Sequence, residues 1–367
     1  MTPKPHPSSA QMRAEIDTLR AIVCLVLVLV LHHMVGISPE YGMELPLDHP
    51  ISHLSHSAAD MRMPVFSFIS GMVFSRATGL WPDARTTIRK KARRLLLPMV
   101  SVGTLFWIAR HITGGEQPPL LLTYVTSYAH FWFLQATFLI MAATVFLVCC
   151  TGANWHRHVA AALGILGMCW WGLGLLPLPA TNWFSISNAT FLLPFFASGY
   201  LISQTPTLRQ TLRSAPWTRP LGALLLAIGL FIGFRLANQD LVLQDMPRRL
   251  LAILLGLSAC FGLLMLRPNQ SRLARIGVYS YAIYLFHVFF TAAVTQLWWH
   301  LEAPGSIWAL TALGVILGTM GPILLQSLIL KSPVCAQLFL GLSAATLRTS
   351  RRKEKERALS STRSSHS

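Results

Sequence analysis

The stretch EIDTLRAIVCLVLVLVLHH (residues 15–33) decides the fold of this chain. Charged residues open it, and an apolar run then continues without a charge until two histidines. About 20 mostly apolar residues cross the roughly 30 Å of hydrocarbon in a bilayer. Similar runs recur along the 367 residues, of which 53% are hydrophobic and only 12% charged. The sequence therefore predicts a polytopic membrane protein and leaves little chain for a water-soluble domain.

Apolar runs bounded by charged residues, Pro or Gly predict an all-α transmembrane helix bundle of about ten spans. The expected spans are 21–38, 63–80, 96–112, 125–150, 159–177, 188–204, 220–237, 249–266, 277–298 and 307–330. They divide the chain into a cytoplasmic N-terminal segment (1–20), a transmembrane domain (21–330) and a basic cytoplasmic tail (331–367). We expect that tail to be largely disordered.

Basic residues set the expected orientation. Most of the 30 Lys and Arg lie in alternate connecting segments, whereas the opposite loops hold only Arg62 and Arg248, with Arg249 at the edge of a span. Cytoplasmic loops carry such an excess, so both termini are expected in the cytoplasm. The net charge of +17 then reflects topology. We expect the lipid bilayer as a partner, and no nucleic acid.

Ionisable groups at membrane depth are costly and usually functional. Arg20 opens the first span, and Asp17 lies three residues earlier, where the two can pair on one helix face. His32 and His33 lie about 18 Å further along a helix. His287 is deep in an apolar span. Arg20 could equally be a residue whose charge reaches the interface, with the histidines at a wet outer end.

Other polar motifs have ordinary structural interpretations. Ser70 lies in a span entered at Pro64, and His130 and Trp132 lie in an aromatic belt. Gly314 and Gly318 form a GxxxG motif, which indicates helix packing within the monomer, with a homodimer as the alternative.

An outer-loop cluster has metal-binding residue types but does not favour a metal, and no metal is expected. Its members are Asp48, His49, His53, His56 and Asp60.

Six segments in order resemble the acyltransferase-3 family of bacterial membrane O-acyltransferases over nearly the whole chain. IDTLRAI (16–22) is similar to the family's Asp-x-Leu-Arg opening, PVFSFISG (64–71) to its Phe-rich Ser-Gly segment, and RKKARRLLLP (89–98) to its basic loop. HFWFLQATF (130–138), FFASGYLI (195–202) and YSYAIYLFH (279–287) are similar to its aromatic, Gly-Tyr and Tyr-x-x-Tyr-Leu-x-His elements.

The resemblance implies a bacterial inner-membrane enzyme that moves an acyl group, most simply acetyl, from cytoplasmic acyl-CoA (acetyl-CoA) to a hydroxyl of an extracytoplasmic carbohydrate or glycolipid. His32 is the expected base, because histidine titrates near neutral pH, and Arg20 is the expected catalytic partner. A cationic clamp for the CoA phosphates is expected from Arg20, Arg89, Lys90, Arg93 and Arg94. Substrate binding is expected from Arg62, Ser70, His130, Trp132 and His287.

Two features depart from the family pattern. One extra residue separates Arg20 from His32, which rotates them about 120° apart instead of about 20°. Either a π-bulge absorbs it, or Arg20 precedes the regular helix; His33 is the alternative base. Arg62 stands where related sequences often have His, and it could bind an anionic sugar or phosphate. Whether the histidine acts as a base or carries the acyl group stays open.

Two other classes of function remain at this stage. A transporter or flippase for a sugar-containing or acylated substrate would line its path with the same charged groups, although no matched inverted repeats are evident. A non-catalytic relative would explain the two departures, although His32 and His287 are intact.

Overall fold

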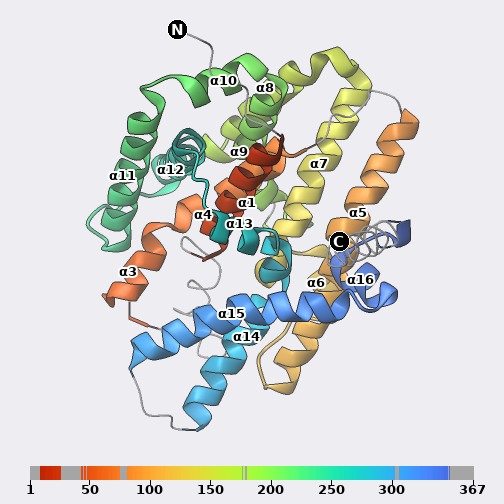
Figure 1. Cartoon of the computed structure of the whole chain (residues 1–367), viewed down its shortest axis with the longest axis vertical. Helices are drawn as coiled ribbons and strands as arrows, with labels where there is room; N and C mark the ends of the chain where they lie inside the picture. The colour runs from red at the N-terminus through yellow and green to blue at the C-terminus, as the bar shows by residue number, and fades with distance from the viewer. Residues whose placement is uncertain are drawn as a thin grey trace, which may run out of the picture.

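The computed structural model describes residues 9–25, 43, 45–46, 48–74, 81–175, 177, 180–301, 306–345 and 347. Over these residues it is helical, with no strand beyond an isolated bridge between Thr126 and Trp183. Figure 1 shows the helices gathered into one bundle. The expected all-α class is confirmed.

The elements of the first half are α1 (Ser9–Leu25), α3 (Pro50–Ser57), α4 (Ala59–Met72), α5 (Trp81–Ile112), α6 (Leu120–Val125), η1 (Ala129–Phe131), α7 (Trp132–Thr151), η2 (Ala153–Trp155), α8 (His156–Gly167) and the π-helical η3 (Met168–Gly172). Those of the second half are α9 (Ile186–Gln204), α10 (Pro206–Ser214), α11 (Thr218–Ala237), α12 (Asp245–Leu266), α13 (Ser271–Gly277), α14 (Ser280–His300), α15 (Ile307–Ile329) and α16 (Pro333–Leu340).

Seven helices in the described part of the chain are long and apolar enough to cross a membrane: α5, α7 together with η1, α9, α11, α12, α14 and α15. They correspond to seven of the ten expected spans. Two others, 21–38 and 63–80, extend beyond the described residues, and 159–177 is divided between α8 and η3. The chain is therefore a multi-pass helical protein, and ten spans stay a prediction.

Helix α1 lies near the centre of the view in Figure 1 and packs mainly on α13. The contact is close because Gly277 has no side chain: a Cβ there would lie 1.7 Å from the carbonyl oxygen of Asp17. The backbone N–H of Gln270 donates to the Thr18 hydroxyl at 3.3 Å. Glu15 forms a buried ion pair with Arg213 of α10 at 2.6 Å. These contacts fix the helix that carries Arg20.

Basic residues gather around the start of α1. We call this region the basic end and define it by Arg20, Arg94, Arg213 and Arg267, with the carboxylate of Glu15 among them. It is the end that we expect to face the cytoplasm. Desolvation lowers the pKa of Arg267, just past α12, and the nearby Arg219 and Arg213 lower it further, while Glu15 acts in the opposite direction. The carboxylate of Glu15 thus lies among several cations.

Helices α4 and α9 pack backbone to backbone. A Cβ on Gly71 would lie 2.1 Å from the Phe196 carbonyl oxygen, and one on Gly199 would lie 2.1 Å from that of Phe68. The Ser67 hydroxyl donates to the Leu192 carbonyl at 3.1 Å. The Ser-Gly and Gly-Tyr segments therefore serve helix packing here, as small residues commonly do in membranes.

The C-terminal helices also pack inside the chain. Gly314 and Gly318 of α15 are buried within the single chain, in agreement with intramolecular packing. The segment that we expected to be a tail begins with α16, whose Leu338 carbonyl accepts a hydrogen bond from Ser101 of α5 at 2.7 Å. Residues 348–367 lie outside the described part, and their expected disorder stays a prediction.

Gly199→Ala should destabilise the α4–α9 contact by about 1–3 kcal/mol, because backbone atoms cannot move aside for the new methyl group. Gly103→Ala is the matched control, since a Cβ there meets only the Phe131 ring, at 3.8 Å. Heating each variant in detergent and following the folded fraction by size-exclusion chromatography would give the melting temperatures of both. Equal melting temperatures for Gly199→Ala and the wild type would contradict this packing.

The charge distribution predicts that the C-terminus stays in the cytoplasm. A C-terminal green fluorescent protein fusion should fluoresce, and a C-terminal alkaline phosphatase fusion should be inactive, because each reporter folds on one side of the membrane only. An active phosphatase fusion would reverse the predicted orientation.

Candidate functional site

Arg94 is the most extensively bound cation at the basic end. Its guanidinium carbon lies 4.1 Å from the ring centre of Tyr281, a cation–π contact, and Nη1 donates to the Leu340 carbonyl of α16. The Tyr281 hydroxyl donates in turn to the Arg94 carbonyl. Three helices, α5, α14 and α16, thus hold one arginine.

Arg20 reaches the same place from α1. Its Nη1 lies 3.0 Å from Asp17 Oδ1, as the spacing of three residues predicted, and its side chain is 32% exposed. Arg20 and Arg94 are close enough to interact electrostatically. Because Asp17 offsets Arg20, the charge of Arg94 is the excess at this point. Two cations from distant segments therefore converge on a partly open surface.

The other predicted clamp residues differ in exposure. Arg89 and Lys90 are exposed on α5, whereas Arg93 is half-buried. Its Nε is buried without a hydrogen-bond partner among the described residues. The neighbouring Lys91 lies over Phe74, with Nζ 5.2 Å from the ring centre. The structure thus brings Arg20 and Arg94 together and leaves Arg89 and Lys90 at the surface.

Helix α14 carries polar groups inward from Arg94. Tyr281, Tyr284 and His287 follow at intervals of three residues, so each lies about 60° around the helix from the one before, over a total rise of about 9 Å. Tyr281 contacts Arg94, and the Tyr284 hydroxyl donates to the His130 carbonyl. This row of side chains connects the basic end with a buried histidine pair.

His130 and His287 form that pair, with ring centres 5.4 Å apart. His287 is fully buried, and His130 is 7% exposed. The Nδ1 atom of His287 lies 2.8 Å from the Ile283 carbonyl, which can only accept, so this hydrogen bond places a proton on Nδ1. In the neutral ring the lone pair is then on Nε2, which can accept a proton.

The segment that carries His130 is fixed by hydrogen bonds across the bundle. Ser127 N–H donates to the Asn182 carbonyl at 3.2 Å, and Phe184 N–H donates to the Val125 carbonyl at 2.7 Å. Phe106 of α5 lies edge-on to His130, with ring centres 5.8 Å apart. Aromatic rings and backbone contacts thus hold the imidazole in place.

Three predicted substrate-binding residues lie elsewhere. Arg62 is 8% exposed, and its Nη1 has no hydrogen-bond partner among the described residues. Its neighbour Asp60 is bound by Arg248 at 2.9 Å. Ser70 is half-buried beside the Gly71 packing contact, and Trp132 is half-buried at the start of α7, two residues after His130. The structure joins His130 with His287 and does not join Ser70 to them.

His32 and His33 lie outside the described residues, so their assignment as base stays a prediction. Arg20 is inside the regular helix α1, which continues to Leu25. The alternative in which Arg20 precedes the helix is therefore wrong, because α1 packs on α13 through residues before Arg20. A π-bulge would have to lie beyond Leu25.

Tyr281 and Tyr284 were not predicted as site residues, although the Tyr-x-x-Tyr-Leu-x-His element contains both of them. Among the described residues, no group of three or more His, Cys, Asp or Glu side chains could hold a metal ion.

These features define a multi-pass helical membrane protein with a cationic surface at one end and a buried histidine pair inside the bundle. Residues 13–327 match the acyltransferase domain of the acyltransferase-3 family, and the chain belongs to that family. It is thus a membrane O-acyltransferase, as the six motifs predicted. Comparisons with curated proteins and with solved structures found no match.

Tyr281→Phe should cost about 1 kcal/mol, because it removes the hydrogen bond to the Arg94 carbonyl but keeps the ring against the guanidinium. Tyr281→Leu should cost more, since the cation–π contact is lost as well. Thermal unfolding of the two purified variants would measure the difference. Identical melting temperatures for Phe and Leu would show that the ring contact contributes nothing.

Proposed function

We propose that the protein transfers an acyl group, most simply acetyl, from acyl-CoA at the basic end to a hydroxyl of a carbohydrate or glycolipid on the opposite side of the bacterial inner membrane. The observation that carries this proposal is the electrostatic proximity of Arg20 to Arg94, whose guanidinium lies over the Tyr281 ring. The family match gives no comparable support to a transporter or flippase.

CoA carries several phosphates, and an arginine binds phosphate through two parallel hydrogen bonds. Arg94 suits this role because Asp17 offsets the charge of Arg20 and leaves that of Arg94 in excess. Its side chain is also held in position by α14 and α16. Arg20 adds a second cation at the edge of the same surface. The phosphates would remain at the basic end, while the thioester reaches inward along α14.

The chemistry requires a base, because an alcohol is a weak nucleophile until its proton is removed. In this proposal His32 takes the proton from the acceptor hydroxyl, the oxygen attacks the thioester carbonyl, and the CoA thiolate leaves. His287 is a second histidine able to accept a proton at Nε2. His130 and Tyr284 orient it by packing and do not enter the reaction.

Transfer of radiolabel from acetyl-CoA to glycan and lipid, in membranes with matched amounts of protein, tests this function. His32→Ala should lower transfer by about 100-fold or more, the usual contribution of a general base. Arg20→Ala and Arg94→Ala should each lower it by about 10-fold or more, through weaker donor binding. Arg85→Ala is the matched control, since Arg85 is an exposed cation on the same helix as Arg94.

The pattern of losses distinguishes the alternatives. Loss with His33→Ala and retention with His32→Ala would transfer the role of base to the second histidine. Undiminished transfer by Arg20→Ala and Arg94→Ala would contradict the proposed donor site. Melting temperatures of the arginine variants separate lost binding from lost folding.

A further inference from the structure

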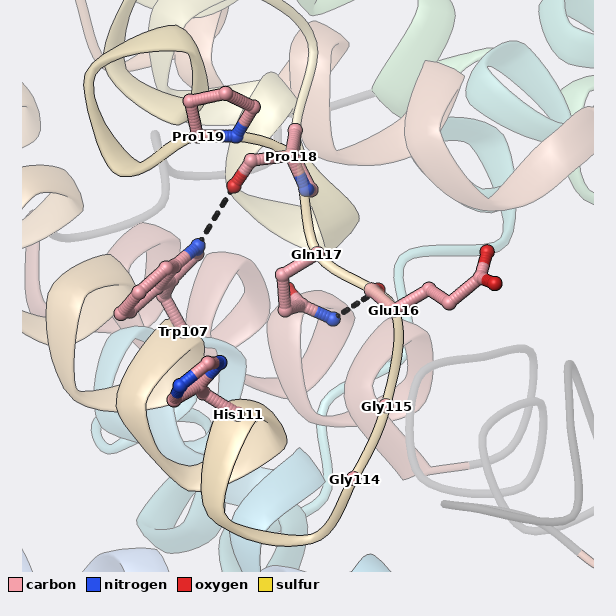
Figure 2. Close-up of a pocket in the computed structure, with 8 residues that line it drawn as sticks. All are labelled: Trp107, His111, Gly114, Gly115, Glu116, Gln117, Pro118 and Pro119. Atoms are coloured by element: carbon pink, nitrogen blue, oxygen red, sulfur yellow. Dashed lines mark hydrogen bonds between the residues drawn. The ribbon is translucent and has the colours of Figure 1, made fainter.

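A pocket of about 460 Å³ lies at the end of α5 opposite the basic end. Figure 2 shows it between the last turns of α5 and the returning loop 113–119. Trp107 and His111 form one wall, and Gln117, Pro118 and Pro119 form the other. Small-molecule sites usually measure about 300–1,000 Å³, so the pocket is large enough for a ligand.

The sequence builds this pocket through the way α5 ends. Gly115 N–H donates to the Arg110 carbonyl at 3.0 Å and Gly114 N–H to that of His111 at 3.3 Å, the two bonds of a Schellman motif. Gly114 has φ +79°, which glycine adopts without strain. The chain therefore turns back along α5, and Trp107 Nε1–H donates to the Pro118 carbonyl at 2.8 Å.

The walls combine flat rings with a fixed amide. The Trp107 and His111 rings are nearly parallel, at 7° with centres 5.1 Å apart. The Gln117 side chain lies between these rings and Glu116 in Figure 2, and its amide is held at both ends: Tyr128 donates to its oxygen, and its nitrogen donates to the Glu116 carbonyl. Glycines at positions 114 and 115 leave backbone groups uncovered by side chains.

This chemistry suits a neutral sugar ring. Aromatic faces carry partial negative charge and attract the slightly positive C–H groups of a pyranose, while amide, imidazole and backbone groups bind its hydroxyls. The lining contains no Lys or Arg that would select an anion. Its carboxylate, on Glu116, points away from the cavity in Figure 2.

The pocket is also close to the buried histidines. Trp107 follows Phe106, whose ring contacts His130 and Phe289. Tyr128, which holds Gln117, also contacts Phe106, with ring centres 6.0 Å apart. Along α5, Trp107 lies about 20 Å from Arg94. A ligand here would therefore lie about 20 Å along α5 from the proposed donor surface, with the ring contacts of Phe106 between the pocket and His130.

We propose that this pocket binds a neutral sugar ring of the acceptor, with Trp107 as the aromatic platform and Gln117 as the hydroxyl partner. The inference rests on the proposed function for the role of the sugar, but binding itself can be measured without acyl transfer.

Saturation-transfer NMR on the full-length protein in a carbohydrate-free amphipol tests this binding. The probes are methyl β-glucoside, methyl β-galactoside, methyl α-mannoside, N-acetylglucosamine and, as the anionic comparison, glucuronate. At least one neutral probe should receive saturation at its ring C–H protons. Trp107→Leu should reduce this signal by at least fivefold, and Trp107→Phe, which keeps a flat ring, by less.

Trp155→Leu is the matched control, because Trp155 is an exposed tryptophan beside a histidine, His158, and does not line this pocket. Gln117→Ala provides a second variant that keeps the aromatic wall. Equal signals for the wild type, Trp107→Leu and Gln117→Ala would overturn the proposal. The absence of signal from all neutral probes, or a clear preference for glucuronate, would overturn it as well. Failure of acyl transfer with intact sugar binding would instead count against the proposed function alone.

Discussion

The contact between the Asp17 backbone and Gly277 determines where α1 lies, and the candidate donor surface depends on it. No other residue type fits at position 277, because a Cβ would overlap the carbonyl oxygen of Asp17. The buried pair of Glu15 and Arg213 adds a second attachment to α10. Because α1 is fixed from two sides, Arg20 lies close enough to Arg94 of α5 to interact with it electrostatically.

The low dielectric of a membrane explains how the polar groups are arranged. A charge is costly away from water, and at the basic end Arg20 is paired with Asp17 and partly exposed, while Arg94 lies over the Tyr281 ring. Farther in, the polar groups of α14 are phenols and an imidazole, and backbone carbonyls accept their hydrogen bonds. The site thus changes from charged to neutral along one helix.

Local spacing in the sequence predicted the features that are contained within a single helix. The apolar runs indicated the spans, and the interval of three residues between Asp17 and Arg20 indicated their ion pair. The pairing of His130 with His287 could not be predicted in this way, because it depends on how η1 and α14 pack. The pocket beside Trp107 was missed for a related reason: the four-residue spacing to His111 indicates a stacked pair, but the returning loop that encloses it depends on long-range contacts.

Helix α16 lies beyond the last residue of the family match, yet it contributes to the surface proposed for the donor. Its Leu340 carbonyl accepts the hydrogen bond of Arg94, and Gly341 packs on the backbone of Arg93, where a Cβ would lie 2.3 Å from the carbonyl oxygen. The family match therefore ends at residue 327, before α16, which helps to hold Arg94. A protein shortened to the matched region would retain Arg94 but lose one of the groups that hold its side chain in place.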